Sequence, residues 1–148
     1  MKPLLLLQLV FVILFAGSCT KNSEDFSQTK ALLQHKWTQI SITYIVPDKP
    51  TLNGTIKLGA GYYYDFKTND TLEMTTNATT GNPPQPYYTK VKYTLRSPTV
   101  YTIGPGTPLR MLTLTDDLLV LQQPINYTIQ TSRGNVSYRG TMIDTLRR

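Results

Sequence analysis

Short runs of alternating apolar and polar residues, separated by proline, glycine and asparagine, constrain this chain more than any other feature. A period of two is typical of half-buried β-strands, and the abundance of Thr, Tyr, Val and Ile favours strands over helices. Pro124 is expected to end or bend one strand, with residues 127–130 continuing its pairing. We therefore predict about eight short strands, at residues 37–44, 62–67, 71–75, 87–96, 99–103, 109–115, 118–121 and 136–146.

The alternation also predicts which side chains share a face in the first two strands. In the first strand, the apolar face is expected to carry Thr38, Ile40, Ile42 and Tyr44. The opposite face is expected to carry Trp37, Gln39, Ser41 and Thr43. In the second strand, one face is expected to carry Tyr62, Tyr64 and Phe66.

One short helix is predicted before the first strand. Ser27 is placed to cap a helical segment that runs through residues 30–34, and Phe26 precedes the cap as a hydrophobic staple. Leu33 and Trp37 lie four residues apart and are expected on one face. A helix this short persists only when it packs against the sheet.

The connections between the strands limit the architecture. Residues 77–86 contain three prolines and one glycine and are predicted to form a long loop. The other connections have the length of hairpin turns, and no helical crossover separates the strands. Two architectures fit this pattern, an up-and-down barrel and a sandwich.

Several motifs between residues 30 and 122 point to one family. They are Leu32-Leu33-x-x-Lys36-Trp37, a hairpin with Tyr64, Phe66, Asn69, Asp70 and Thr71, the strand Tyr93-Thr94-Leu95, and the run from Leu112 to Leu121. Together they resemble the lipocalin-like domains of Bacteroidetes lipoproteins, from which this chain departs at His35 and in its Pro-rich loop. The resemblance implies an all-β fold, a small antiparallel up-and-down (calycin/lipocalin-like) barrel of about eight strands with a short N-terminal helix, whose floor Trp37 closes.

The N-terminus predicts export. Lys2 precedes residues 4–15, which are apolar except for Gln8, match the length of a signal-peptide core and fall short of the ~20 residues that a spanning helix needs. Residues 16–18 are small and directly precede Cys19, the only cysteine of the chain. This arrangement resembles a bacterial lipobox. We predict a signal peptide over residues 1–18 and lipid attachment at Cys19.

These features also predict the domain order and the location. Residues 19–26 are expected to form the lipidated N-terminus and a polar tether, and residues 27–148 the barrel domain. Two or three acyl chains attach a protein stably, so the membrane is the expected partner, at the bacterial outer membrane on its periplasmic face or at the cell surface. The alternatives are an ordinary secretory signal cleaved near Ser18 and an uncleaved anchor helix.

The formal net charge of +6 does not indicate nucleic-acid binding. A nucleic-acid interface concentrates basic residues on one face, interleaved with aromatic residues. Here the lysines and arginines are scattered, and only Arg147 and Arg148 are adjacent. The charge indicates solubility and weak attraction to anionic surfaces.

We predict no catalytic residue, no cofactor and no metal site. His35 is the only histidine and stands at the end of the expected helix, where a cation has a structural role. One histidine and one modified cysteine cannot supply a metal-ligand set. Asp116 and Asp117 fit a turn better than a pair of converging catalytic carboxylates, and residues 104–106 lack the lysine of a phosphate-binding loop.

Aromatic residues give the one indication of a ligand. Aromatic-lined interiors suit small hydrophobic or glycan ligands, whereas an eight-stranded barrel is just wide enough to be filled by its own side chains. Two functions follow, a ligand-binding envelope lipoprotein and an interaction module with a filled barrel that docks an envelope protein. The candidate ligand-binding residues are Trp37, Tyr62, Tyr64, Phe66 and Tyr93.

Two triplets resemble the O-glycosylation acceptor of exported Bacteroidetes proteins. In Asp70-Thr71-Leu72 the acceptor is Thr71, and in Asp144-Thr145-Leu146 it is Thr145. Both triplets are expected at turns or near the C-terminus.

Overall fold

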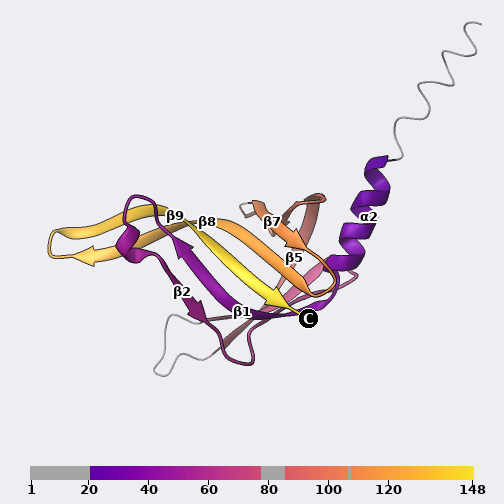
Figure 1. Cartoon of the computed structure of the whole chain (residues 1–148), viewed down its shortest axis with the longest axis horizontal. Coiled ribbons are helices and arrows are strands. Elements are labelled where there is room, and N and C mark those ends of the chain that lie inside the picture. Colours follow the sequence, from indigo (N-terminus) through magenta and orange to yellow (C-terminus); the bar gives the residue numbers. More distant parts are fainter. Residues whose placement is uncertain (1–20, 78–85, 107) are drawn as a thin grey trace, which may run out of the picture.

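The computed structural model describes residues 21–77, 86–106 and 108–148. These residues form the helix α2 (Lys21–Leu33), the short 3-10 helix η1 (Pro50–Leu52) and nine strands (Figure 1). The strands are β1 (Lys36–Ile45), β2 (Gly54–Lys57), β3 (Tyr63–Phe66), β4 (Thr71–Asn77), β5 (Pro86–Ser97), β6 (Val100–Ile103), β7 (Pro108–Leu114), β8 (Leu118–Thr131) and β9 (Gly134–Arg147). The signal peptide, Cys19 and most of the predicted Pro-rich loop lie outside the described residues.

The strands form one antiparallel sheet that closes on itself. From β3 to β9, each strand pairs with the next along the chain, and β9 pairs with β1 over residues 38–45. The other edge of β1 pairs with β3 through residues 36–38 and with β2 through residues 41–44. β2 and β3 therefore lie one after the other along the same edge of β1. Together they take the place of one strand in an eight-stranded barrel. This confirms the predicted up-and-down barrel and excludes the sandwich.

β1 contains a bulge that the alternation of its sequence did not predict. Its pairing with β9 shifts register between Gln39 and Ser41, so Ile40 is an extra residue. A bulge of one residue reverses the alternation of side chains between the two faces. Trp37 is buried before the bulge, and Ile42 turns to the same inner face after it. The predicted apolar face is therefore wrong before the bulge, where Ile40 is 37% exposed.

Two further strands differ from the prediction. β2 was missed, because four exposed residues with one isoleucine carry no alternating pattern. β8 continues unbroken through Pro124 for 14 residues. From Gln123 onward β8 pairs with β9 but not with β7. A proline is tolerated on such an edge, where its missing N–H breaks no second ladder.

The helix α2 begins at Lys21, six residues before the predicted cap at Ser27. Ser27 is an exposed residue inside the helix, so its predicted role as the cap is wrong. No proline or glycine stands in residues 21–33, and the helical backbone therefore continues through the segment that was expected to be part of the tether.

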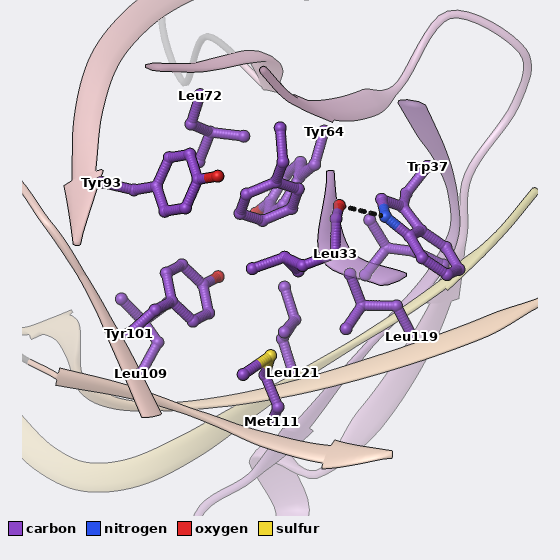
Figure 2. Packing of buried hydrophobic residues seen from close by; sticks show 12 residues of the cluster. Leu33, Trp37, Tyr64, Leu72, Tyr93, Tyr101, Leu109, Met111, Leu119 and Leu121 are labelled. Carbon is purple, nitrogen blue, oxygen red and sulfur yellow. Dashed lines mark hydrogen bonds between the residues drawn. The ribbon is translucent and has the colours of Figure 1, made fainter. Parts of the chain in front are cut away.

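The C-terminal end of α2 inserts into one end of the barrel. Leu33, its last residue, is fully buried, and the indole Nε1 of Trp37 donates a hydrogen bond of 3.0 Å to the Leu33 carbonyl (Figure 2). This bond satisfies one of the carbonyls that a helix end leaves unpaired. The buried cluster around it comprises Leu33, Trp37, Tyr64, Phe66, Leu72, Tyr93, Tyr101, Leu109, Met111, Leu119, Leu121 and Leu146.

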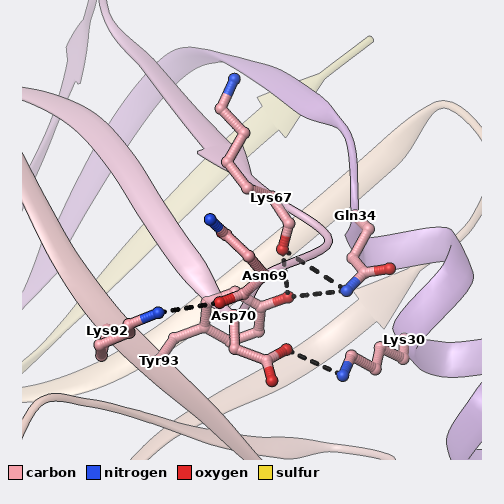
Figure 3. Close-up of polar contacts among 7 residues, drawn as sticks. All are labelled: Lys30, Gln34, Lys67, Asn69, Asp70, Lys92 and Tyr93. Atoms are coloured by element: carbon pink, nitrogen blue, oxygen red, sulfur yellow. Dashed lines mark hydrogen bonds and ion pairs between the residues drawn. The ribbon is translucent and has the colours of Figure 1, made fainter.

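Polar contacts hold the same end of α2 against the turn between β3 and β4 (Figure 3). Lys30 Nζ lies 2.8 Å from the carboxylate of Asp70. The side-chain amide of Gln34 donates to the hydroxyl of Tyr93 at 3.3 Å, and this hydroxyl donates to the carbonyl of Lys67 at 3.3 Å. The contacts join the end of the helix to the turn of the β3–β4 hairpin and to β5, so the helix is fixed in orientation as well as in position.

Replacement of Leu33 by alanine is expected to lower the free energy of unfolding by about 2–5 kcal/mol, because it leaves a cavity where the helix enters the barrel. Equilibrium unfolding in denaturant measures the change. Leu112→Ala is the matched control, because Leu112 is 45% exposed, and its effect should stay within about 0.5 kcal/mol. Equal losses of unfolding free energy in the two variants would contradict the conclusion that Leu33 fills the space where the helix enters the barrel.

Candidate functional site

The inner face of the barrel is fully buried near α2 and becomes exposed toward the far ends of β8 and β9. Leu119 and Leu146 lie opposite each other near α2 and are fully buried. Along β9 the alternation keeps Met142 and Val136 on the same face as Leu146. Met142 is only half-buried and Val136 is 39% exposed. The side chains of this face are therefore fully buried near α2 and partly exposed farther along, although Val46, which follows β1, is fully buried beside Gly140 and Ile125.

The partly exposed region of this face is called here the open inner face. In the β-ladders, Ile42 lies opposite Ile56, and Tyr44 lies opposite Met142. The rings of Tyr44 and Tyr127 meet edge to face with centroids 6.3 Å apart. Ile56 lies on the same inner face as Ile42, and its side chain is nevertheless 50% exposed. The open inner face consists of Ile42, Tyr44, Ile56, Tyr127 and Met142.

A buried polar cluster borders the open inner face. Asp144 lies opposite Ile42 in the β1–β9 ladder and is fully buried. Gln39 Nε2 donates to its Oδ1 at 2.7 Å, and the Tyr64 hydroxyl donates to its Oδ2 at 3.4 Å. Burial raises the pKa of Asp144 to about 6, although both hydrogen bonds act to lower it. The two bonds connect β1, β3 and β9 inside the barrel.

Tyr101 of β6 adds a hydroxyl group that has no hydrogen-bond partner among the described residues. Its side chain is fully buried, and Figure 2 shows the hydroxyl pointing into the middle of the buried cluster. Burial raises the pKa of Tyr101 well above its ordinary value, and Tyr64 and Asp144 raise it further. An unpaired buried hydroxyl costs about 1–3 kcal/mol, so this group is a candidate for contact with a ligand.

No cation balances Asp144 within the part of the chain that the structure describes. Every described lysine and arginine side chain is exposed or half-buried, and the ion pairs among them involve other carboxylates. A charge inside a protein is normally paired or neutralised, because burial without a partner is costly. Within the described residues, the hydrogen bonds from Gln39 and Tyr64 are therefore the interactions that offset the burial of the Asp144 carboxyl group.

The structure brings four of the five predicted ligand-binding residues together. Trp37, Tyr64, Phe66 and Tyr93 all belong to the buried cluster, in which the rings of Phe66 and Tyr93 meet edge to face with centroids 5.2 Å apart. Tyr62 precedes β3 and is half-buried. These contacts are those of core residues, and only Tyr64 also reaches the buried polar cluster. Contact of the five with a ligand stays a prediction.

Sequence reasoning missed Gln39, Tyr101 and Asp144 as site residues. Asp144 was noted only as part of a modification triplet, although it stands between Met142 and Leu146 at the inward positions of the last strand. A carboxylate within an apolar alternation was the available signal. For Gln39 and Tyr101 the sequence carried no such signal, because polar and aromatic residues occur on both faces of these strands.

Other predicted features also have defined positions. Asp116 and Asp117 lie between β7 and β8, which confirms the predicted turn. His35 is exposed between the end of α2 and the start of β1. Thr71 is 4% exposed at the start of β4, so a glycosylating enzyme cannot reach it in the folded barrel. Thr145 is half-buried on β9.

Two cavities on the outside of the barrel flank α2. One, of about 200 Å³, lies between the helix and β7 and is lined by residues that include Leu32 and Leu112. The other, of about 420 Å³, lies at the end of the helix and is lined by residues that include Leu32, His35 and Arg148. Both lie outside the barrel and are separate from the open inner face.

Comparisons with known proteins give a distant structural likeness. No family model and no curated protein matches the chain. Bovine odorant-binding protein, as a deswapped triple mutant, is 15% identical with a TM-score of 0.43, and the match covers 79% of this chain and 74% of that one. Aphrodisin, a sex pheromone from female hamster, is 21% identical with a TM-score of 0.42, and the match covers 78% and 74%. Both TM-scores lie below 0.5, so the barrel assignment rests on the strand pairing.

The described residues contain neither a metal-binding group nor a helix that could span a membrane. No group of histidine, cysteine and acidic side chains within them is arranged to hold a metal ion. Among the helices that the structure describes, none combines the length and the apolar character needed to cross a membrane. Lipid attachment at Cys19 stays a prediction, since that residue precedes the described part.

The raised pKa of Asp144 predicts a specific pH dependence of stability. Its pKa rises from 3.8 to about 6 on folding, so the folded state binds the proton more tightly. The stabilisation is present below about pH 4 and is lost as the pH rises to about 6, a fall of about 3 kcal/mol for two pKa units. Asp144→Asn keeps an acceptor for Gln39 and should remove this fall.

Denaturant unfolding of both proteins between pH 4 and pH 7.5 measures this difference. The free energy of unfolding of the wild type, relative to that of Asp144→Asn, should decrease through this range. Asp144→Ala is the control, because it leaves the amide of Gln39 without its acceptor and should destabilise at every pH. Parallel curves for the wild type and Asp144→Asn would contradict a buried carboxylate with a raised pKa.

Proposed function

We propose that this chain is a non-enzymatic lipoprotein of the bacterial envelope whose barrel binds one small hydrophobic ligand at the open inner face. One observation carries the proposal. Ile56 is 50% exposed, although its partner Ile42 lies opposite the fully buried Asp144 on the same face. A barrel filled throughout by its own side chains would bury an apolar residue at that position.

The chemistry of the open inner face favours a hydrophobic ligand over a glycan. Binding sites for small molecules are mostly apolar, with a few polar groups that set orientation. Ile42, Ile56 and Met142 supply apolar contacts, and Tyr44 supplies an aromatic ring with a polar tip. The buried polar cluster supplies the few polar groups at one end. A glycan needs hydrogen-bonding groups along its whole length, and these aliphatic side chains offer none.

The proposed lipid on Cys19 explains how the barrel would be held at the membrane. Two or three acyl chains give stable attachment, since each buried CH₂ contributes about 0.8 kcal/mol. α2 starts two residues after Cys19, and its 13 residues span about 20 Å at ~1.5 Å per residue. Because the helix enters the filled end of the barrel, the open inner face would point away from the bilayer. It would then exchange ligand with the periplasm or the cell exterior.

The test compares two exposed isoleucines on opposite faces of neighbouring strands. Ile56 belongs to the open inner face. Thr43 and Thr55 share a hydroxyl hydrogen bond of 2.9 Å on the outer face, and Ile45, two residues after Thr43, lies on that outer face and is 39% exposed. Ile56→Lys places a charge in the proposed site, whereas Ile45→Lys places the same charge outside it.

Native mass spectrometry of the full chain, purified from its native envelope in a nonionic detergent, measures the bound ligand. The wild type and Ile45→Lys should carry a mass excess that disappears on denaturation. In Ile56→Lys the affinity should fall about tenfold, since each 1.4 kcal/mol is a factor of ten and placing a charge against an apolar ligand costs at least that much, and the occupied fraction should fall with it. A bare wild-type mass, or an excess retained in Ile56→Lys, would refute the ligand proposal and favour the interaction module.

A further inference from the structure

We infer that two copies of this chain associate through the free edge of β8, so that their two long hairpins form one four-stranded antiparallel sheet. The free edge lies on the outer part of the β8–β9 hairpin. Residues 125–131 of β8 pair with residues 134–140 of β9, and within the described part of the chain neither segment pairs with a third strand. Residues 125–140 are called here the projecting hairpin, which Figure 1 shows extending from the barrel at the end opposite α2.

The projecting hairpin has one apolar and one polar face. On the inner face the cross-strand pairs are Ile125–Gly140, Tyr127–Tyr138 and Ile129–Val136. On the outer face the pairs are Asn126–Arg139, Thr128–Ser137 and Gln130–Asn135. A two-stranded hairpin is only marginally stable in water, whereas three or more strands with an apolar face are stable by themselves. A further strand at one edge would therefore stabilise this segment.

The edge of β8 lacks the features that normally prevent strands from pairing. Proteins protect such edges with charged side chains, bulges or proline. Residues 125–131 contain no charged residue and no proline, and their register with β9 runs without a bulge. Pro124 lies directly before them. The opposite edge of the hairpin carries Arg139, so the edge of β8 is the better suited of the two to accept a strand.

The turn of the hairpin determines which backbone groups face this edge. Residues 132 and 133 form the turn, and a two-residue hairpin loop closes on a hydrogen-bonded pair, here Thr131 and Gly134. Bonded and non-bonded pairs alternate from that point along an antiparallel ladder. The backbone N–H and C=O groups of Asn126, Thr128 and Gln130 are therefore directed away from β9 and toward the free edge.

A second copy of β8 matches this edge about a two-fold axis at Thr128. Thr128 then lies opposite Thr128 of the other copy, and Asn126 lies opposite Gln130, so the outward N–H and C=O groups meet each other. On the inner face Tyr127 lies beside Ile129 of the other copy, and symmetry repeats this favourable aromatic–aliphatic pair. No charged side chain lies in the seam, because the two copies of β8 separate the two Arg139 side chains.

The length of the seam sets the strength of the association. Seven residues extend over about 24 Å at ~3.4 Å per residue, which gives a contact at the low end of protein–protein interfaces. The dimer is therefore expected to be weak and reversible. It forms at the end of the barrel opposite α2, so a proposed lipid on Cys19 leaves the seam accessible.

Sedimentation equilibrium of the full chain in a density-matched nonionic detergent, with micelles in excess over protein, measures the association. The weight-average mass of the protein should rise from that of a monomer toward that of a dimer between about 5 µM and about 500 µM. Thr128→Lys places two like charges opposite each other in the seam, so its dissociation constant should be at least about tenfold higher.

Ser137→Lys is the matched control. It removes the same hydroxyl hydrogen bond of 2.8 Å between Thr128 and Ser137 and adds the same charge to the same outer face, but one strand away from the seam. It should associate like the wild type. Thr128→Glu should also be monomeric, and an equimolar mixture of Thr128→Lys and Thr128→Glu should restore the dimer, because opposite charges then face each other.

A cysteine at the two-fold axis tests the register. Cα atoms of a bonded antiparallel pair lie about 5.5 Å apart, which is within the range that a disulfide spans. Under mild oxidation Thr128→Cys should form a covalent dimer of the full chain, and Ser137→Cys should remain monomeric.

Each outcome decides the inference. A wild type that stays monomeric over the whole range overturns it and leaves a strand of a different protein as the partner that the edge fits. A dimer that survives Thr128→Lys, or that Ser137→Lys weakens equally, also overturns it, as does a mixture of the Lys and Glu variants that stays monomeric. Loss of the dimer in Thr128→Lys alone, with recovery in the mixture, supports it. None of these results depends on a bound ligand, so the association and the proposed function are tested separately.

Discussion

The pairing of β1 with β9 is the constraint on which the rest of the structure depends. It converts a meander of strands into a closed barrel, and it carries the hydrogen bond of 2.7 Å between Gln39 and Asp144 across the seam. The bulge at Ile40 lies in the same seam and turns Ile42 to the inner face beside Asp144. Without this pairing the carboxylate would meet solvent and lose the environment that raises its pKa.

Unequal strand lengths explain why one end is filled and the other is open. β6 has four residues and β7 has seven, whereas β8 and β9 have 14 each. Near α2 all members of the barrel are present, and Leu33 and Trp37 complete the packing between them. Beyond Gln122, β8 has no partner on the side of β7 among the residues that the structure describes. The inner face of the long hairpin therefore lacks an opposite wall and stays partly exposed.

The polar cluster at the boundary between the two ends lowers the free energy of unfolding of the barrel. A buried carboxylate without a counter-ion and an unpaired hydroxyl both reduce stability, and apolar residues of similar size would avoid the cost. Such groups are typical of sites where stability is given up for recognition.

The sequence by itself determined an all-β fold, most of the strands and the aromatic core, because alternation and turn residues are local properties. Alternation left the barrel and the sandwich open, and the pairing of β1 with β9 decided between them. It also predicted the exported, lipidated N-terminus, which lies outside the described residues. Only the tertiary structure decided the inner face of β1, because a bulge at Ile40 depends on the register with β9, about a hundred residues away. For the same reason it alone assembled Gln39, Tyr64 and Asp144 into one hydrogen-bonded cluster. These residues stand on three strands, and barrel closure brings them together.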